Sequence, residues 1–146
     1  MLNRASTILP AGAWDRSREI GDILADADAR YRRRMRFTTR QGLDFLLDLP
    51  RPQRLSDGDG LELQDGRVIR VIAQTEALLD ITAFDDQALT RIAWHLGNRH
   101  IPVQFLRHRL RIRAEATAAD LVDRLGGDAA EIEAAFDPEP GAYAHG

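Results

Sequence analysis

Four histidines are the scarce side chains that could supply soft chemistry in this chain, because Cys and Lys are both absent. The 146-residue sequence has no Cys, and all 20 of its cationic side chains are Arg. Without Cys there are no disulfides, thiolate zinc sites, iron–sulfur clusters or cysteine nucleophiles. Without Lys there is no P-loop lysine, Schiff-base lysine or Ser-Lys dyad. A metal would therefore bind nitrogen and oxygen, with imidazole from His95, His100, His108 or His145.

Motifs for nucleophilic and hydrolytic catalysis are also missing. The sequence contains no His-Glu-x-x-His, and no Gly-x-Ser-x-Gly surrounds any of its three serines, Ser6, Ser17 and Ser56. Carboxylates are plentiful, but several precede glycine in turns, where the backbone alone explains them: Asp57, Asp59 and Asp65. We therefore predict that the protein is not an enzyme.

His100 is the strongest candidate ligand. It follows Gly97-Asn98, where a helix that starts at Asp85 is predicted to stop in the left-handed conformation, and it opens a predicted strand over 100–105. On that strand its imidazole points away from the local core. A lone histidine there is usually a solvated surface residue. A strand start at the end of a sheet can also meet its copy across a two-fold axis, so that two His100 side chains form half of a metal site.

The other three histidines have weaker positions. His95 lies on the flank of the same helix, and we predict that its ring is partly buried by packing. The alternative is that His95 orients a metal ligand. His108 stands between Arg107 and Arg109 in a predicted chain reversal, where a dication is repelled, and we predict a surface residue. His145 belongs to a Pro/Gly-punctuated tail, which makes it a mobile ligand for any site that it can reach.

The first half of the chain is predicted to be a small all-β domain, over residues 1–75. Arg32–Thr39 alternates like a half-buried strand, and a second apolar run, Leu43 to Leu49, is predicted to be ended by Pro50 and Pro52. Asp65-Gly66 separates two further strand patterns and predicts a two-residue type I′ turn. No helical pattern of useful length interrupts residues 31–74, which supports the all-β assignment.

The second half is predicted to be a ferredoxin-like βαββαβ domain over residues 76–137, followed by a short flexible tail over 138–146. Strand and helix periodicities alternate in the order of the split βαβ motif. The expected elements are a strand at 77–83, a helix from Asp85, strands at 100–105 and 109–113, a helix that Thr117 opens with a capping box, and a strand at 131–136. The fold class is therefore α+β.

Arginine-rich strands provide a competing function, a nucleic-acid-binding module. One set lies in and just before the predicted strand that begins at Arg32: Arg30, Arg32, Arg33, Arg34 and Arg36. The other lies on the predicted strand 109–113: Arg109, Arg111 and Arg113. The net charge of −3 and the scarcity of neighbouring aromatic residues disfavour nucleic acid as a partner. A solvated strand face or a docking surface for an acidic protein is the preferred interpretation.

The composition indicates an ordinary globular protein, with 44% hydrophobic and 29% charged residues. The longest apolar runs fall far short of the roughly 18 to 20 residues that cross a bilayer. Residues 1–14 contain no apolar stretch between a basic start and a cleavage site. We expect a cytoplasmic protein without a membrane partner.

Two segments carry a family resemblance, His-Leu-Gly-Asn-Arg-His-Ile-Pro at 95–102 and Phe-Asp-Pro-Glu-Pro-Gly-Ala-Tyr at 136–143. The segments 42–50 and 55–71 add to it. Over residues 30–143 the sequence resembles the urease accessory protein E family, the nickel metallochaperones. The Gly-Asn-Arg-His element is the specific part of this match.

The resemblance implies a β domain that engages partners and a ferredoxin-like domain that forms a homodimer. It also implies one Ni²⁺ bridged between protomers by the histidine of Gly-Asn-Arg-His, which is His100 here, with His145 as an extra ligand. The implied partners are the urease accessory GTPase and the urease apoprotein complex. Cu²⁺ and Zn²⁺ compete for such nitrogen sites. Because coordination needs neutral imidazole, affinity is expected to fall below about pH 6.5.

Two departures from the family pattern change these expectations. The tail holds a single histidine, so we expect no reservoir for many ions. Many members place a histidine in a segment where this chain has Ala114, Glu115 and Ala116, so an auxiliary site there is expected to be lost or reduced to Glu115. A scaffold that keeps the fold and partner docking but has reduced metal binding therefore remains a further alternative.

Overall fold

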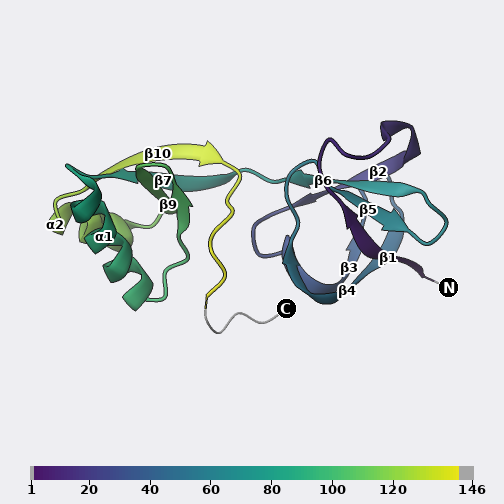
Figure 1. Cartoon of the computed structure of the whole chain (residues 1–146), viewed down its shortest axis with the longest axis horizontal. Coiled ribbons are helices and arrows are strands. Elements are labelled where there is room, and N and C mark those ends of the chain that lie inside the picture. Colours follow the sequence, from purple (N-terminus) through teal and green to yellow (C-terminus); the bar gives the residue numbers. More distant parts are fainter. Residues whose placement is uncertain (1, 142–146) are drawn as a thin grey trace. The chain divides into compact units, whose positions relative to one another are not determined.

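The structure is a computed structural model that describes residues 2–141, and its chain divides into two compact units at Gln74 and Thr75 (Figure 1). One unit is built from strands, with a single 3-10 turn, and the other combines two helices with four strands. The predicted α+β class is thus confirmed. Along the described residues, no helix is both long and apolar enough to cross a membrane.

The first unit contains one six-stranded mixed sheet in the order β2-β6-β5-β1-β4-β3. Its elements are β1 (Asn3–Leu9), η1 (Arg16–Arg18), β2 (Glu19–Ala25), β3 (Tyr31–Thr38), β4 (Asp44–Arg54), β5 (Gly60–Leu63) and β6 (Val68–Ala73). Large apolar side chains fill the interior, and the rings of Phe37 and Phe45 stack with centroids 5.8 Å apart. Neither β1 nor β2 was predicted from the sequence; in β1 only Ala5 is buried and no alternation of apolar residues marks the strand.

The prediction that the second strand ends at Pro50 is wrong, because β4 continues to Arg54. Arg34 lies opposite Asp48 and Arg32 opposite Gln53, so residues 49–52 of β4 bulge out opposite a single residue of β3. Pro50 and Pro52 lie in this bulge. A bulge leaves residues unpaired, so the missing proline N–H groups cost no ladder hydrogen bonds there.

The turn at Asp65-Gly66 joins β5 to β6, but it is not type I′. Of its residues only Gly66 has a positive φ, 89°. The Gly66 N–H donates to Leu63 O at 2.9 Å, and the Leu63 N–H donates to Arg67 O at 2.8 Å. These bonds define a three-residue loop in which a type I turn is followed by a left-handed glycine.

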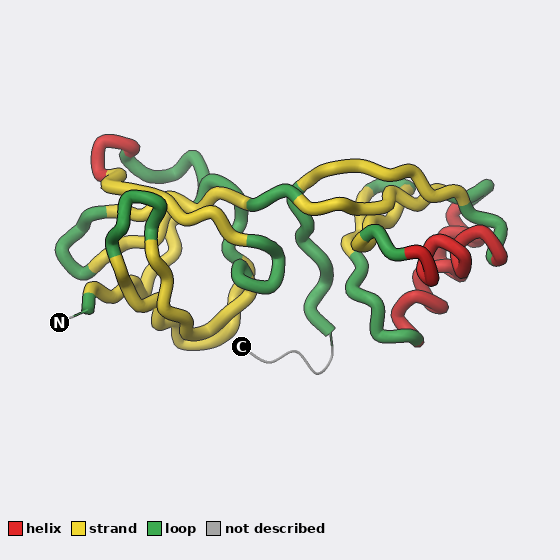
Figure 2. Tube along the Cα trace, turned by 180° about the vertical axis from the view of Figure 1, so that it is seen from behind, coloured by secondary structure: helices red, strands yellow, loops and turns green. Residues whose placement is uncertain are grey.

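The second unit has the predicted βαββαβ order. Its elements are β7 (Glu76–Thr82), α1 (Asp86–Asn98), β8 (Gln104–Leu106), β9 (Arg109–Arg113), α2 (Ala116–Arg124) and β10 (Asp128–Ala134). The strands form an antiparallel sheet in the order β10-β7-β9-β8. Both helices lie on the same face of this sheet (Figure 2), and the core between them includes Ile81, Ile92, Leu96, Ile112 and Val122.

Three local predictions in this unit need correction. The strand expected over 100–105 is shorter and later, since β8 is Gln104–Leu106. The last strand is also displaced, to Asp128–Ala134. The capping box at Thr117 is wrong, because α2 begins at Ala116 with Glu115 as its N-cap. The Thr117 hydroxyl instead donates to Glu115 Oε1 at 2.5 Å, within the first turn of the helix.

Candidate metal centre

His100 lies just beyond the end of α1, in the left-handed conformation. Its φ is 60°, whereas Gly97 and Asn98 continue the helix. The predicted left-handed stop at Gly97-Asn98 is therefore wrong, and so is the placement of His100 on a strand. The residue that ends the helix is the candidate ligand itself. Left-handed backbone is costly for a residue with a Cβ, so this placement needs support from its neighbours.

Two backbone hydrogen bonds hold His100 in this conformation. The His100 N–H donates to Gly97 O at 3.0 Å, and the Ile101 N–H donates to Leu96 O at 3.1 Å. This is the pattern of a Schellman motif, with His100 at the position usually taken by glycine. Leu96 is fully buried and Ile101 packs against the same core, as the hydrophobic contact of that motif requires. The backbone thereby fixes the direction in which the His100 side chain leaves the helix.

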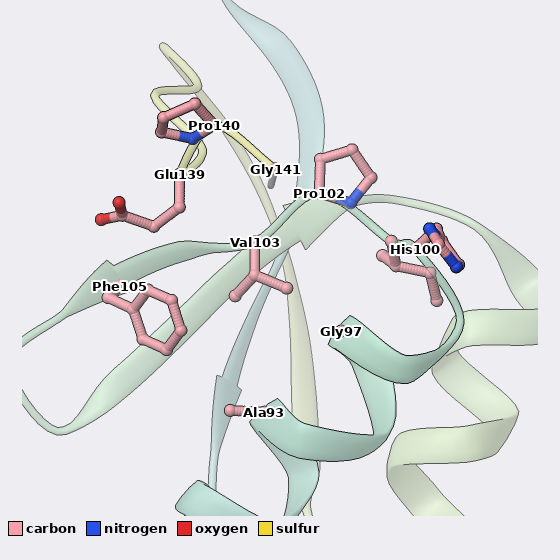
Figure 3. Close-up of a pocket in the computed structure, with 10 residues that line it drawn as sticks. Ala93, Gly97, His100, Pro102, Val103, Phe105, Glu139, Pro140 and Gly141 are labelled. Atoms are coloured by element: carbon pink, nitrogen blue, oxygen red, sulfur yellow. The ribbon is translucent and has the colours of Figure 1, made fainter. Parts of the chain in front are cut away.

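His100 borders a groove of about 590 Å³ on the second unit. Apolar side chains form much of the lining of this groove, among them Ala93, Val103 and Phe105. Figure 3 shows His100 and Glu139 on opposite sides of it, with the Glu139 carboxylate directed away from the imidazole. Phe105 is 55% exposed, so this region presents apolar surface beside an exposed imidazole.

The segment after β10 crosses the sheet towards this groove. The Phe136 ring is fully buried, with the Arg113 guanidinium 5.0 Å from its centroid. The Asp137 N–H then donates to Gln104 Oε1 at 2.9 Å, and the Glu139 N–H donates to Val103 O at 2.8 Å. These contacts lead the chain from one edge strand, β10, to the other, β8. They bring Gly141 into the lining of the groove that His100 borders.

The other histidines lie elsewhere or outside the described residues. His95 is half-buried on α1, with its ring edge-on to Trp94 at a centroid distance of 5.0 Å. His108 is exposed in the turn between β8 and β9, also with φ 60°, and its Nδ1 is 3.1 Å from Asp86 Oδ1. His145 falls in 142–146, beyond the part of the chain that the structure describes, as does most of the predicted flexible tail.

One chain does not assemble a metal site from its described residues alone. Within 2–141, no three His, Asp or Glu side chains gather where they could hold an ion. His100 supplies one exposed imidazole, and the charged end of Glu139 is turned away from it. A site at His100 therefore requires donors from a second chain, from residues 142–146, or from both.

The two arginine strips predicted from the sequence differ in the structure: the arginines of β9 all have carboxylate partners, whereas in the first strip Arg36 pairs with Asp44 and Arg30 is buried. Arg30 is fully buried and donates to the carbonyl oxygens of Ala25 and Leu55, so it belongs to the interior. On β9, Arg111 donates to both carboxylate oxygens of Asp80, at 2.7 and 3.3 Å. The other two arginines of that strand also have carboxylate partners, as shown by the pairs Arg109–Asp80 and Arg113–Glu76. The β9 strip is thus not an open cationic surface.

Family models account for almost the whole chain. The model for the N-terminal domain of the UreE urease accessory protein matches residues 5–74, and the model for its C-terminal domain matches 76–146. Their junction coincides with the boundary between the two structural units. The chain belongs to the UreE family. The family resemblance inferred from 95–102 and 136–143 is therefore confirmed.

Several curated UreE proteins are similar to this chain. A urease accessory protein UreE from Rhodopseudomonas palustris (strain HaA2) is 55% identical over 84% of the chain, which spans 57% of that relative's length. UreE from Beijerinckia indica is 47% identical over 97% of the chain and 81% of the relative. UreE from Rhodobacter capsulatus is 39% identical over the entire chain and 90% of the relative.

Proposed function

We propose that this UreE chain is a nickel-binding accessory protein of urease maturation. It acts in the cytoplasm as a homodimer, has no catalytic activity of its own, and passes Ni²⁺ to the urease apoprotein complex together with the accessory GTPase. The observation that carries this proposal is the position of His100, an exposed imidazole held by the backbone at the border of an apolar groove.

A second chain is part of the proposal because residues 2–141 of one chain bring no three ligands together. Imidazole nitrogen suits Ni²⁺, and two His100 side chains related by a two-fold axis supply two such donors. The exposed apolar side chains beside His100 support an interface there, since burying them between two copies removes them from water. The same association brings both imidazoles to one axis.

His145 is a proposed additional ligand because the described chain ends at the groove that His100 borders, four residues before it. Gly141 lines the groove that His100 borders, and four residues of fully extended chain span up to about 14 Å. An imidazole at 145 is thus within reach of an ion held by His100. A ligand set of two His100 and one or two His145, completed by water, leaves the ion open to exchange, as a carrier requires.

Calorimetric titration with Ni²⁺ and Zn²⁺ tests the proposal. The variants are His100→Ala and a matched control, His108→Ala, which removes another exposed histidine with the same φ of 60°. His100→Ala is expected to lose the tightest equivalent of nickel per dimer, while His108→Ala keeps it. Far-UV circular dichroism confirms that both variants are folded. Full nickel binding by folded His100→Ala would overturn the assignment of His100.

A further inference from the structure

The outer edge of the first unit's sheet ends in a strand that has a partner on one side only. β3 occupies the last position in the order β2-β6-β5-β1-β4-β3, and among the strands of residues 2–141 it pairs with β4 alone. Over eight residues it presents a row of backbone N–H and C=O groups without ladder partners on its other side. Such an edge can accept another extended segment as an additional strand.

Arginines without carboxylate partners lie on this edge strand and in the bulge of β4 beside it. Arg32 and Arg34 are exposed on β3, and Arg51 is exposed in the β4 bulge that faces β3. Within residues 2–141, none of these three makes an ion pair or a side-chain hydrogen bond. Nearby arginines of the sheet behave differently, as shown by the pairs Arg36–Asp44 at 3.1 Å and Arg4–Asp48 at 3.6 Å.

The β4 bulge concentrates this charge. Residues 49–52 lie opposite Arg33, and its guanidinium reaches across to Leu49 O at 3.4 Å. The register therefore places Arg51 opposite Arg33, between the β3 positions of Arg32 and Arg34. Like charges held close together repel one another, so an unneutralised cluster in a chain with net charge −3 favours a negatively charged ligand. We call Arg32, Arg34 and Arg51 the edge arginines.

A polypeptide fits this edge better than a nucleic acid. The one aromatic ring among these arginines, Tyr31, is covered by the Arg54 guanidinium at 5.0 Å, and Phe37 is buried in the core. The edge thus offers no exposed ring on which bases could stack. It does offer main-chain groups, which an extended peptide pairs with and a nucleic acid does not. Two copies of this edge would repel each other, whereas an acidic segment would be attracted.

We propose that the outer edge of β3 is a docking site for an extended acidic segment of a partner protein. The segment adds to the sheet as a strand beside β3 and places its carboxylates against the edge arginines. The site belongs entirely to the first unit and uses no histidine, so it stands independently of nickel binding.

Binding of short labelled peptides to the full chain tests this site. The probe is an eight-residue peptide of alternating Glu and Val, the length of β3, followed by fluorescence anisotropy. Changing Arg32, Arg34 and Arg51 together to Ser is expected to weaken binding by about tenfold or more. The control changes Arg91, Arg107 and Arg124 to Ser, which removes the same charge from the other unit, and binding is expected to be unchanged. Equal weakening in both triple variants would overturn the site.

Two further probes separate strand addition from simple charge attraction. A version of the peptide methylated on alternate backbone nitrogens keeps its carboxylates but cannot complete a ladder, and it is expected to bind more weakly. Binding as tight as that of the unmodified peptide would overturn strand addition. A single-stranded oligonucleotide of eight bases is expected to bind more weakly than the acidic peptide. Tighter binding that depends on the edge arginines would overturn the choice of a protein partner.

Discussion

The backbone N–H of Ile101 donates to the carbonyl oxygen of Leu96, 3.1 Å away, and the residue just before Ile101 is the proposed nickel ligand. Closing this bond requires His100 to adopt φ 60°, a conformation that costs a residue with a Cβ roughly 1 kcal/mol or more. Packing of Leu96 and Ile101 in the core offsets that cost. The position therefore holds an imidazole where stability alone would favour glycine.

Replacing His100 by Gly should separate stability from metal binding. Glycine adopts positive φ without strain, so the free energy of unfolding of the metal-free protein is expected to rise by about 1 kcal/mol. Nickel binding at the tightest site should be lost. Urea denaturation and calorimetry measure the two effects. The control His108→Gly relieves the same φ of 60° in a turn and should keep nickel binding. A strongly destabilised His100→Gly would contradict the Schellman geometry.

The regular elements could be predicted because their periodicities are local. Leu89, Ile92 and Leu96 repeat with the helical period along α1, and all three are buried. β1 escaped prediction because its pairing with β4 and β5, rather than an apolar pattern of its own, makes it a strand. The bulge of β4 escaped because it depends on the register against β3, which short-range sequence does not encode.

The candidate site was located in sequence but its conformation was not. Glycine is the usual left-handed residue after a helix, so Gly97 was the natural choice for the stop. The signal that favours His100 is the apolar pair Leu96 and Ile101, five residues apart, which a Schellman motif brings together around the left-handed residue. The path of 136–141 back to the groove rests on long-range bonds to Gln104 and Val103, which no local pattern reveals.

Removing His145 should weaken nickel binding without preventing dimerisation. Deleting residues 145–146 removes a proposed ligand but leaves His100 and the apolar groove intact. Nickel affinity is expected to fall by about tenfold, the loss of one moderate ligand contact, while the mass of the protein by light scattering stays that of a dimer. Deleting Gly146 alone serves as the control and should leave the affinity unchanged. If both deletions bind nickel as the full chain does, His145 is not a ligand.

Gln104 should contribute to nickel affinity only through the segment that leads to His145. Its Oε1 accepts the Asp137 N–H at 2.9 Å, so Gln104→Leu loosens the segment that brings Gly141 to the groove. A looser segment lowers the effective concentration of His145 at the metal, and the affinity is expected to fall by a few-fold.

A double-mutant cycle checks this coupling. In the chain without residues 145–146, Gln104→Leu is expected to leave nickel affinity unchanged, because the ligand that Gln104 positions is already gone. An equal loss of affinity in both backgrounds would show that Gln104 acts on the site by another route.

Asp22 should make the stability of the first unit depend on pH. Hydrogen bonds from the Arg40 guanidinium, one of them 2.9 Å long to Asp22 Oδ2, lower the pKa of this carboxyl below its ordinary value of 3.8. Because the folded pKa lies below the unfolded one, the stabilisation is fully present above the unfolded value. It is lost as the pH falls through the folded pKa. Asp22→Asn should therefore be less stable than the parent at pH 7, and the difference should shrink in acid.

Urea denaturation from about pH 7 down to about pH 2 measures this difference. The chain has two tryptophans, so Trp94→Phe in all variants leaves Trp14, in the first unit, as the fluorescent reporter. Arg40→Gln and the double variant complete a cycle that isolates the Asp22–Arg40 interaction. A favourable coupling is expected at neutral pH, and it should disappear once Asp22 is protonated. A coupling that keeps its size in acid would show that the pair stabilises the unit through packing rather than through charge.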